Sequence, residues 1–258
     1  MSSPSTLYIR TDSCIQRLHP FTKLSYILLT GVAVYVGPPG WMFDLLLLSI
    51  NLTMLGIAGV AKEGLQLIIR IMLPLLLFMI PIHGFLHPDN YTVLFNLSGI
   101  HFYLEGLVVS LTTLLQLTVV LLTSLLFVLT THPADLISAV SQTGKSPSLA
   151  YILGSPFLLL ADMRERVNTI QAAQRARGLN TDGNFIRRFY SLAPLVMPLV
   201  VGAIIETEQR SIALEVRGFK SGNPKTFFRR IDDSKPQRFA RWMMFAMAFF
   251  LTMYRLVW

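Results

Sequence analysis

Long apolar runs alternate with short polar segments over the first half of the chain. A helix that crosses the hydrocarbon core of a bilayer needs about 20 apolar residues, and four runs approach or reach this length. They are Leu24–Val36, Trp41–Val60, Leu65–Ile82 and Tyr103–Thr130. The first run is short and ends at residues 37–40, whose sequence Gly-Pro-Pro-Gly predicts a tight turn between the first two spans.

The second half of the chain mixes apolar and charged segments. Pro133–Gln142 is expected to form a short helix. Ser155-Pro156 predicts the start of a long helix ending near Arg177, because serine is a preferred N-cap and proline fits the first helical position. A second long helix, over residues 192–217, is apolar at first and charged in its latter half. The last apolar run, residues 239–258, predicts a fifth span, with four or six spans in total as the alternatives.

The composition places these runs in a membrane. Hydrophobic residues make up 53% of the 258 residues and charged residues only 14%, against about 25% in a typical soluble domain. No Lys or Arg occurs between Lys23 and Lys62, or between Arg70 and Lys145. We therefore expect an all-α integral membrane protein with about five transmembrane helices, plus a cytoplasmic module of two long crossing helices and one short helix. The expected domains are residues 1–131 with four spans, residues 132–236 with the cytoplasmic module, and residues 237–258 with the last span.

The positions of the cations orient the spans, because Lys and Arg collect on the cytoplasmic side of a membrane protein. Arg10 and Arg17 precede the first span and Lys62 lies between the second and third, whereas the two opposite connections contain no Lys or Arg. The N-terminus and the helical module are therefore expected in the cytoplasm. Fourteen of the 22 cations lie between Lys145 and Lys235, interspersed with carboxylates. The net charge of +8 therefore forms no phosphate-binding stripe, and nucleic acid is not an expected partner.

Familiar catalytic and cofactor motifs are absent from the sequence. The chain has no GxxxxGK[ST] phosphate-binding loop, so it is not expected to hydrolyse ATP itself, and neither an enzymatic activity nor a cofactor is expected. Cys14 is the only cysteine, which excludes an intrachain disulfide and a cysteine-based metal site. Asp44 and Glu105 lie at the margins of spans, where we expect their carboxylates to reach water.

Potential metal ligands gather in or near the longest outward connection, namely His83, His87, Asp89 and His101. The i, i+4 spacing of His83 and His87 would place two imidazoles on one side of a metal ion if the segment were helical. Pro81, Gly84 and Pro88 argue against a continuous helix there, so interfacial polar residues are the favoured interpretation and no metal site is expected.

Arginine precedes glycine at the ends of both long helices. The two segments are Gln174–Leu179 and Leu214–Phe219, which contain Arg177-Gly178 and Arg217-Gly218. Ordinary capping explains a single example, because glycine terminates helices and a cation in the last turn complements the helix dipole. Two examples at equivalent places favour a second role, since arginine at a rigid helix end binds a partner's carboxylate through two parallel hydrogen bonds.

Small residues occur on both long helices and would permit their close crossing. They are Ala172, Ala173 and Ala176 on the first helix and Gly202 and Ala203 on the second. Ordinary helical composition explains them equally well.

Taken together, these motifs resemble the transmembrane T component of energy-coupling factor transporters, the EcfT/CbiQ family. That family has two Ala-Arg-Gly motifs at the ends of two cytoplasmic coupling helices. Ala176-Arg177-Gly178 matches the first, whereas the second departs from it because Val216 precedes Arg217-Gly218. The segment Leu18–Leu24 and the pair His132-Pro133 are also similar to the family, and the resemblance covers essentially the whole chain.

The resemblance implies a non-catalytic scaffold in a bacterial or archaeal cell membrane. Its coupling helices would dock into two ABC ATPase subunits, identical or different, and would support a small membrane-embedded S component that binds a vitamin or a transition-metal ion. The residues implied to contact the ATPases are Ala176, Arg177, Gly178, Val216, Arg217 and Gly218, with Arg175 as a secondary candidate.

Two other functions remain open on the sequence alone. The same basic helix ends would suit a membrane anchor or assembly protein that binds a different cytoplasmic partner. A lipid-modifying membrane enzyme is disfavoured, because no cluster of carboxylates or histidines is expected to face the cytoplasm.

Overall fold

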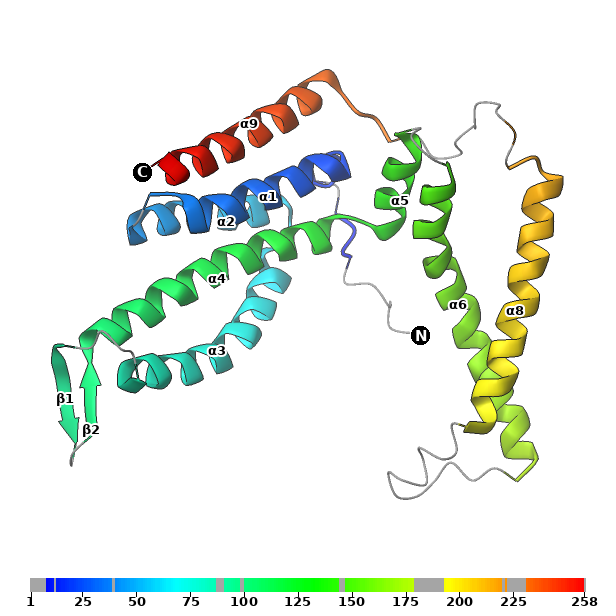
Figure 1. The fold of residues 1–258 in the computed structure, drawn as a ribbon, viewed down its shortest axis with the longest axis horizontal. Coiled ribbons are helices and arrows are strands. Elements are labelled where there is room, and N and C mark those ends of the chain that lie inside the picture. The colour runs from blue at the N-terminus through cyan, green and yellow to red at the C-terminus, as the bar shows by residue number, and fades with distance from the viewer. Residues whose placement is uncertain are drawn as a thin grey trace. The chain divides into compact units, whose positions relative to one another are not determined.

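The computed structural model describes most of the chain and is predominantly helical (Figure 1). The residues described are 8–11, 13–38, 40–86, 91–97, 100–143, 147–178, 193–219, 221 and 231–257. The chain divides into two compact units, Met1–Ala139 with Arg230–Trp258, and Val140–Arg229.

The first unit contains apolar helices joined in part by a β-hairpin. Its helices are α1 (Pro20–Val36), α2 (Trp41–Ile57), α3 (Ala61–Leu86), α4 (Leu104–Thr130) and α9 (Lys235–Val257). Helix α4 packs against α1, α2 and α3, and α9 lies along α1. Helix α5 (Pro133–Gln142) follows α4 and has the predicted bounds.

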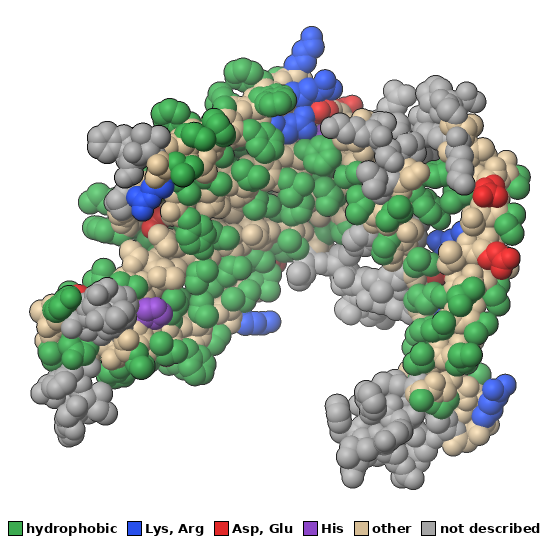
Figure 2. Space-filling model, viewed as in Figure 1, with side chains coloured by type: hydrophobic (Ala, Val, Ile, Leu, Met, Phe, Trp, Pro, Cys, Tyr) green, Lys and Arg blue, Asp and Glu red, His purple; other side chains and the backbone are tan. Residues whose placement is uncertain are grey.

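Helices α3 and α4 are long and apolar enough to cross a membrane, and α1 and α2 are shorter apolar helices. In the most apolar 18-residue stretch of α3, only 6% of the residues are buried inside the protein. The corresponding share for α4 is 28%. A core helix of a water-soluble protein buries most of its apolar surface, whereas these helices leave theirs exposed (Figure 2). A surrounding bilayer would cover this apolar surface.

The core of the first unit is aliphatic with a few satisfied polar groups. Leu55 and Leu122 are 0% and 1% exposed, and further leucines of α4 pack beside them. Asn51 is also buried, and its Oδ1 accepts hydrogen bonds from Thr123 Oγ1 at 2.9 Å and Tyr26 Oη at 3.3 Å. Burying an amide in an apolar core is costly unless such bonds are made, so this group links α1, α2 and α4.

Helix α3 runs through Pro81 and Gly84 without a break, so the expectation that these residues interrupt it is wrong. Proline is tolerated in membrane helices when neighbouring groups re-satisfy the freed backbone. The glycines instead serve close packing. A Cβ atom built on Gly84 would lie 2.1 Å from the Phe102 ring, and one on Gly106 would lie 2.0 Å from the His83 carbonyl oxygen.

Two features of the first unit differ from the sequence-based expectations. Strands β1 (Val93–Leu97) and β2 (Ile100–Tyr103) form an antiparallel hairpin before α4 that the apolar pattern did not predict. Asp44 is only 4% exposed, so its carboxylate does not reach water as expected. In contrast, Glu105 accepts hydrogen bonds from the Thr92 backbone nitrogen at 3.0 and 3.2 Å, which ties α4 to the start of the hairpin.

The second unit is an antiparallel pair of helices, α6 (Pro147–Ala176) and α8 (Ala193–Val216) (Figure 1). Helix α6 begins eight residues before the predicted Ser155-Pro156 start, with Pro156 inside it. Ser155 is therefore not an N-cap, and its Oγ lies 3.3 Å from the Ile152 carbonyl oxygen as an internal back-bond.

The small residues of α6 do not provide the close crossing that they would permit. Ala172, Ala173 and Ala176 are exposed and do not mediate a close crossing. Gly202 does lie at the contact, where it faces the side chain of Arg166. A Cβ atom built on Gly202 would lie 3.0 Å from Arg166 Nη1.

Candidate functional site: two Arg-Gly helix ends

Helix α6 ends at Arg177-Gly178 with the backbone that glycine favours. Gly178 has φ +90°, and its N–H donates to the Arg175 carbonyl oxygen at 3.0 Å. The Arg177 N–H donates to the carbonyl oxygens of Ala173 and Gln174 at 3.2 and 3.1 Å. A left-handed glycine and short backbone bonds of this kind terminate a helix.

Helix α8 ends in the same way, and the complete capping motif is visible here. Gly218 has φ +68°, and its N–H donates to the Glu215 carbonyl oxygen at 2.9 Å. The Phe219 N–H donates to the Leu214 carbonyl oxygen at 2.9 Å. Together the two bonds form a Schellman motif, so the glycine at each end is explained by chain geometry.

The arginines are not used by the cap. The side chains of Arg175, Arg177 and Arg217 are exposed, and within the described part of the chain none of the three guanidinium groups makes an ion pair or a side-chain hydrogen bond. Val216 is 83% exposed, so its larger side chain fills no internal space. The capping geometry leaves both arginines available to another molecule.

The two Arg-Gly ends lie at opposite ends of the helix pair. Gln174 Nε2 donates to the Pro194 carbonyl oxygen at 3.4 Å, which places the end of α6 beside the beginning of α8. The Tyr151 and Phe219 rings lie 5.7 Å apart, which places the end of α8 beside the first turns of α6. With 24 residues in α8, a rise of about 1.5 Å per residue separates the ends by about 36 Å.

Between these ends, four charged side chains link the helices. We call them the charge quartet: Asp162 and Arg166 on α6, and Glu206 and Arg210 on α8. Arg166 Nη2 lies 2.7 Å from Glu206 Oε2, and Arg210 Nη2 lies 2.7 Å from Asp162 Oδ2. Arg210 also donates from Nε to Glu206 Oε1 at 3.0 Å. The hydrogen bonds to Glu206 raise the pKa of Arg210 above its ordinary value, and the charges of Glu206 and Asp162 act in the same direction.

The charge quartet was not predicted from the sequence, although a signal for it exists. Both helices carry an acidic residue four positions before an arginine, a spacing that puts the two side chains on one helix face. The signal becomes meaningful only when the helices are known to be antiparallel, because only then does each acid meet the opposite arginine.

Most of the chain is similar to a known family of proteins. The family model of cobalt transport proteins, CbiQ, matches residues 11–226. The chain belongs to this family. The curated relatives include the energy-coupling factor transporter transmembrane protein EcfT of Lactococcus lactis subsp. cremoris, 25% identical over 234 residues that cover 87% of each chain. The proteins of the same name from Bacillus subtilis and Brevibacillus brevis are 26% and 27% identical, covering 87% and 85% of each chain.

Membership of the CbiQ family confirms the predicted resemblance and identifies the chain as a membrane protein of a transport family. The relatives are named as transmembrane components of a transporter and not as ATPases. The matched region includes both Arg-Gly ends and the charge quartet.

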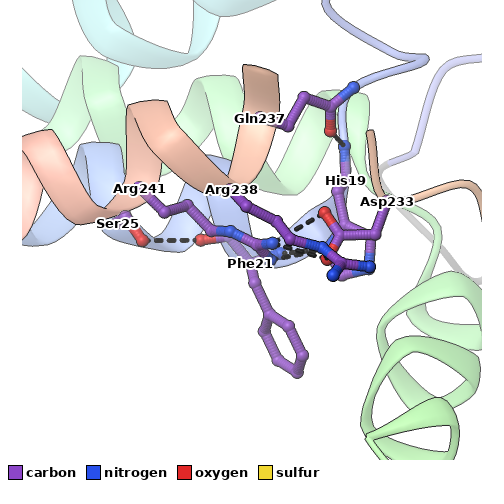
Figure 3. Close-up of polar contacts among 7 residues, drawn as sticks. All are labelled: His19, Phe21, Ser25, Asp233, Gln237, Arg238 and Arg241. Carbon is purple, nitrogen blue, oxygen red and sulfur yellow. Dashed lines mark hydrogen bonds and ion pairs between the residues drawn. The ribbon is translucent and has the colours of Figure 1, made fainter. Parts of the chain in front are cut away.

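The segment Leu18–Leu24, which lies within the region that the CbiQ family model matches, joins α1 to α9 and α4. The His19 N–H donates to Gln237 Oε1 at 2.9 Å, and His19 Nδ1 caps α1 by accepting from the Phe21 N–H at 3.3 Å (Figure 3). Lys23 Nζ donates to the Thr130 carbonyl oxygen at 2.9 Å, at the end of α4. This segment is therefore a structural junction of the first unit.

Opposite His19, two arginines share one carboxylate. Arg241 Nη2 donates to both oxygens of Asp233 at 2.6 Å, and Arg238 Nε donates to Asp233 Oδ2 at 3.0 Å (Figure 3). Arg241 Nη1 lies 3.4 Å from His19 Nδ1. Burial lowers the pKa of His19; the charges of Arg241 and Arg238 lower it further, against the opposing charge of Asp233.

The histidines of the outward connection do not form a described metal site. His83 Nδ1 lies 3.1 Å from the Met79 carbonyl oxygen in α3, a local helical contact. His87 and Asp89 lie outside the described residues. Among the residues with a described position, no group of three potential ligands lies together.

Proposed function

We propose that this chain is the non-catalytic coupling subunit of an energy-coupling factor importer. The observation that carries the proposal is the pair of exposed Arg-Gly ends on one antiparallel helix pair, with capping satisfied and neither guanidinium group bonded to a side chain within the described residues. A cation in the last turn complements the dipole of its own helix, but this does not explain why both long helices end in arginine and glycine.

Two ends separated by about 36 Å, the length of 24 residues at about 1.5 Å per residue, suit two separate binding sites better than one. A dimer of ABC ATPases offers such a pair of sites, one on each subunit. Arg177 and Arg217 would each bind carboxylates of one subunit through two parallel hydrogen bonds, with Arg175 as a secondary contact. Closure of the ATPases on ATP would then move both helix ends together.

The remaining partners follow from the same proposal. The exposed apolar faces of the first unit would contact lipid and a small membrane-embedded S component that carries a vitamin or a transition-metal ion. The proposed topology has five spans in a bacterial or archaeal cell membrane, with the N-terminus and the α6–α8 pair in the cytoplasm. The relatives' name as energy-coupling factor transporter components supports this assignment.

Charge reversal at the helix ends tests the proposal. The chain is expressed with its neighbouring transporter genes and purified by an affinity tag, and the ATPases that remain bound are quantified. We expect Arg177→Glu with Arg217→Glu to lose both ATPases and substrate uptake, because each new carboxylate would face an acidic site. Asn168→Glu with Gln209→Glu is the matched control, since both are exposed positions on α6 and α8 and the change adds acid away from the ends.

The result that would sink the proposal is full ATPase retention and uptake in the doubly reversed protein. Retention of a different cytoplasmic protein through the same two arginines, with no ATPase in the unmodified complex, would identify a membrane anchor or assembly protein instead.

A further inference from the structure

Within the charge quartet, the Arg166–Glu206 pair lies the same number of residues from both Arg-Gly ends. Arg166 and Glu206 face each other across the helix pair. Arg177 lies eleven residues after Arg166, and Arg217 lies eleven residues after Glu206, which is about 16 Å of helix in each case. Because the helices are antiparallel, the two arms of equal length point in opposite directions from this contact.

Charged side chains that reach from one helix to the other form this contact. Arg166 binds α8 twice, through Glu206 Oε2 at 2.7 Å and through the Gly202 carbonyl oxygen at 3.2 Å. Arg210 reaches back to Asp162 on α6. Glu206 receives hydrogen bonds or ion pairs from both arginines, and its side chain is only 12% exposed.

Gly202 makes room for this arrangement. A Cβ atom at this position would lie 3.0 Å from Arg166 Nη1, so the guanidinium group would have to move before any larger residue could be accommodated. The backbone of α8 and the Arg166 fork are thus in direct contact.

Ion pairs whose partners stay partly exposed, as Arg166, Arg210 and Asp162 do at 39%, 29% and 49%, contribute little to stability, typically about 0–1 kcal/mol each, so the quartet is a poor explanation for why the helices fold. The quartet better explains how α6 and α8 are aligned along each other. Sliding one helix by a turn along the other would place Arg166 against Arg210 or Glu206 against Asp162, and like charges in contact are unfavourable. The alternating signs therefore select one alignment of α6 and α8.

We infer that the charge quartet is the fixed contact about which α6 and α8 act as one rigid unit, and that Arg166, Glu206 and Arg210 are positioning residues for coupling. The role in coupling rests on the proposed function. A rigid helix pair would transmit movement of one Arg-Gly end to the other. The inference does not require the quartet to touch an ATPase or a substrate.

The test measures alignment and coupling separately in the full chain with its ATPases and S component. On a Cys14→Ser background, spin labels at Ala172→Cys and Ser211→Cys, both exposed positions, report the distance distribution between α6 and α8. Glu206→Gln removes the shared carboxylate charge with little change of shape. Glu208→Gln is the matched control, because Glu208 is an exposed carboxylate on the same helix.

We expect Glu206→Gln to broaden the distance distribution and to lower substrate uptake per ATP hydrolysed several-fold while both ATPases remain bound. Glu208→Gln should change neither quantity. Inverting all four charges, as Asp162→Arg, Arg166→Glu, Glu206→Arg and Arg210→Glu together, should restore a narrow distribution because every opposite-charge contact is restored.

An unchanged distribution in Glu206→Gln would overturn the inference, as would a fourfold variant as broad as Glu206→Gln or a broadened variant that still couples normally. Failure of the proposed function looks different: the unmodified complex would lack ATPases, while the spin-label distances would still decide whether the quartet aligns the helices.

Discussion

At the scale of single residues, glycine and arginine contribute separately to each helix end. Gly178 and Gly218 have positive φ angles, a conformation that costs other L-residues roughly 1–2 kcal/mol. The arginines before them make no contact that the cap needs. Val216, the departure from the Ala-Arg-Gly motif, is 83% exposed, so its effect falls on whatever binds the α8 end and not on the fold.

His19 predicts a pH dependence of the junction between α1 and α9. Its pKa is lowered by burial and by Arg241 and Arg238, so the folded protein binds the proton less readily than the unfolded chain. The stabilisation is therefore complete above about pH 6.5, the ordinary histidine value, and is lost as the pH falls below it. We expect the thermal midpoint of the purified protein to decrease from pH 8 to pH 5.

The variant His19→Asn isolates this effect, because asparagine is a good N-cap and does not titrate in this range. Burial raises the pKa of Asp233, but bonds and charge from Arg241 outweigh this and hold it below its ordinary value. Asp233 thus stays ionised from pH 8 to pH 5 and cannot supply the change. A decrease of equal size in His19→Asn would contradict the prediction.

At the scale of elements, the apolar pattern predicted helices best where their ends coincide with a change of polarity. Helix α5 has the predicted bounds, and α4 begins one residue after the predicted Tyr103. The start of α6 was missed because Ser155-Pro156 has the chemistry of an N-terminus, yet the preceding apolar turns continue the helix through it. Local capping chemistry cannot reveal that a preceding segment is also helical.

The hairpin and the charge quartet were missed for a related reason. The hairpin residues pair with each other and pack on α3, as the rings of Phe85 and Phe102 at 5.2 Å show. The quartet likewise depends on which residues of α6 face which residues of α8. Both follow from tertiary neighbours, whereas the Arg-Gly ends were found because a helix end is local.

The packing of α4 on α3 predicts a large penalty for a single methyl group. In Gly106→Ala the new Cβ would lie 2.0 Å from the backbone carbonyl oxygen of His83, and backbone atoms cannot move aside as a flexible side chain does. We expect a loss of about 1–3 kcal/mol or more in unfolding free energy, typical of overpacking, measured as a lower thermal midpoint in detergent.

Gly31→Ala is the matched control, because nothing lies within 4 Å of a Cβ built on Gly31 in α1. Alanine is favoured over glycine inside a helix by up to about 1 kcal/mol, so this variant should be neutral or slightly more stable. Equal midpoints for the two variants would show that α3 and α4 do not pack as closely as described.

At the scale of the whole molecule, exposed apolar residues and cations occupy different parts of the sequence. Exposed apolar residues continue along α3 and α4, whereas most cations lie after residue 144. Family membership and the two long apolar helices make this a membrane protein. The number of spans, their orientation and the domain boundaries at residues 132 and 237 stay predictions.

The orientation can be measured with the natural cysteine. Cys14 is exposed and precedes α1, on the side that the positive-inside rule assigns to the cytoplasm. A membrane-impermeant maleimide should therefore label Cys14 in inside-out vesicles and not in intact cells. In Cys14→Ser with Tyr91→Cys the pattern should reverse, because Tyr91 is 82% exposed beside the hairpin on the predicted outer side. Labelling of both positions from the same side would refute an odd number of spans between them, and with it the proposed path of α1, α2 and α3 through the membrane.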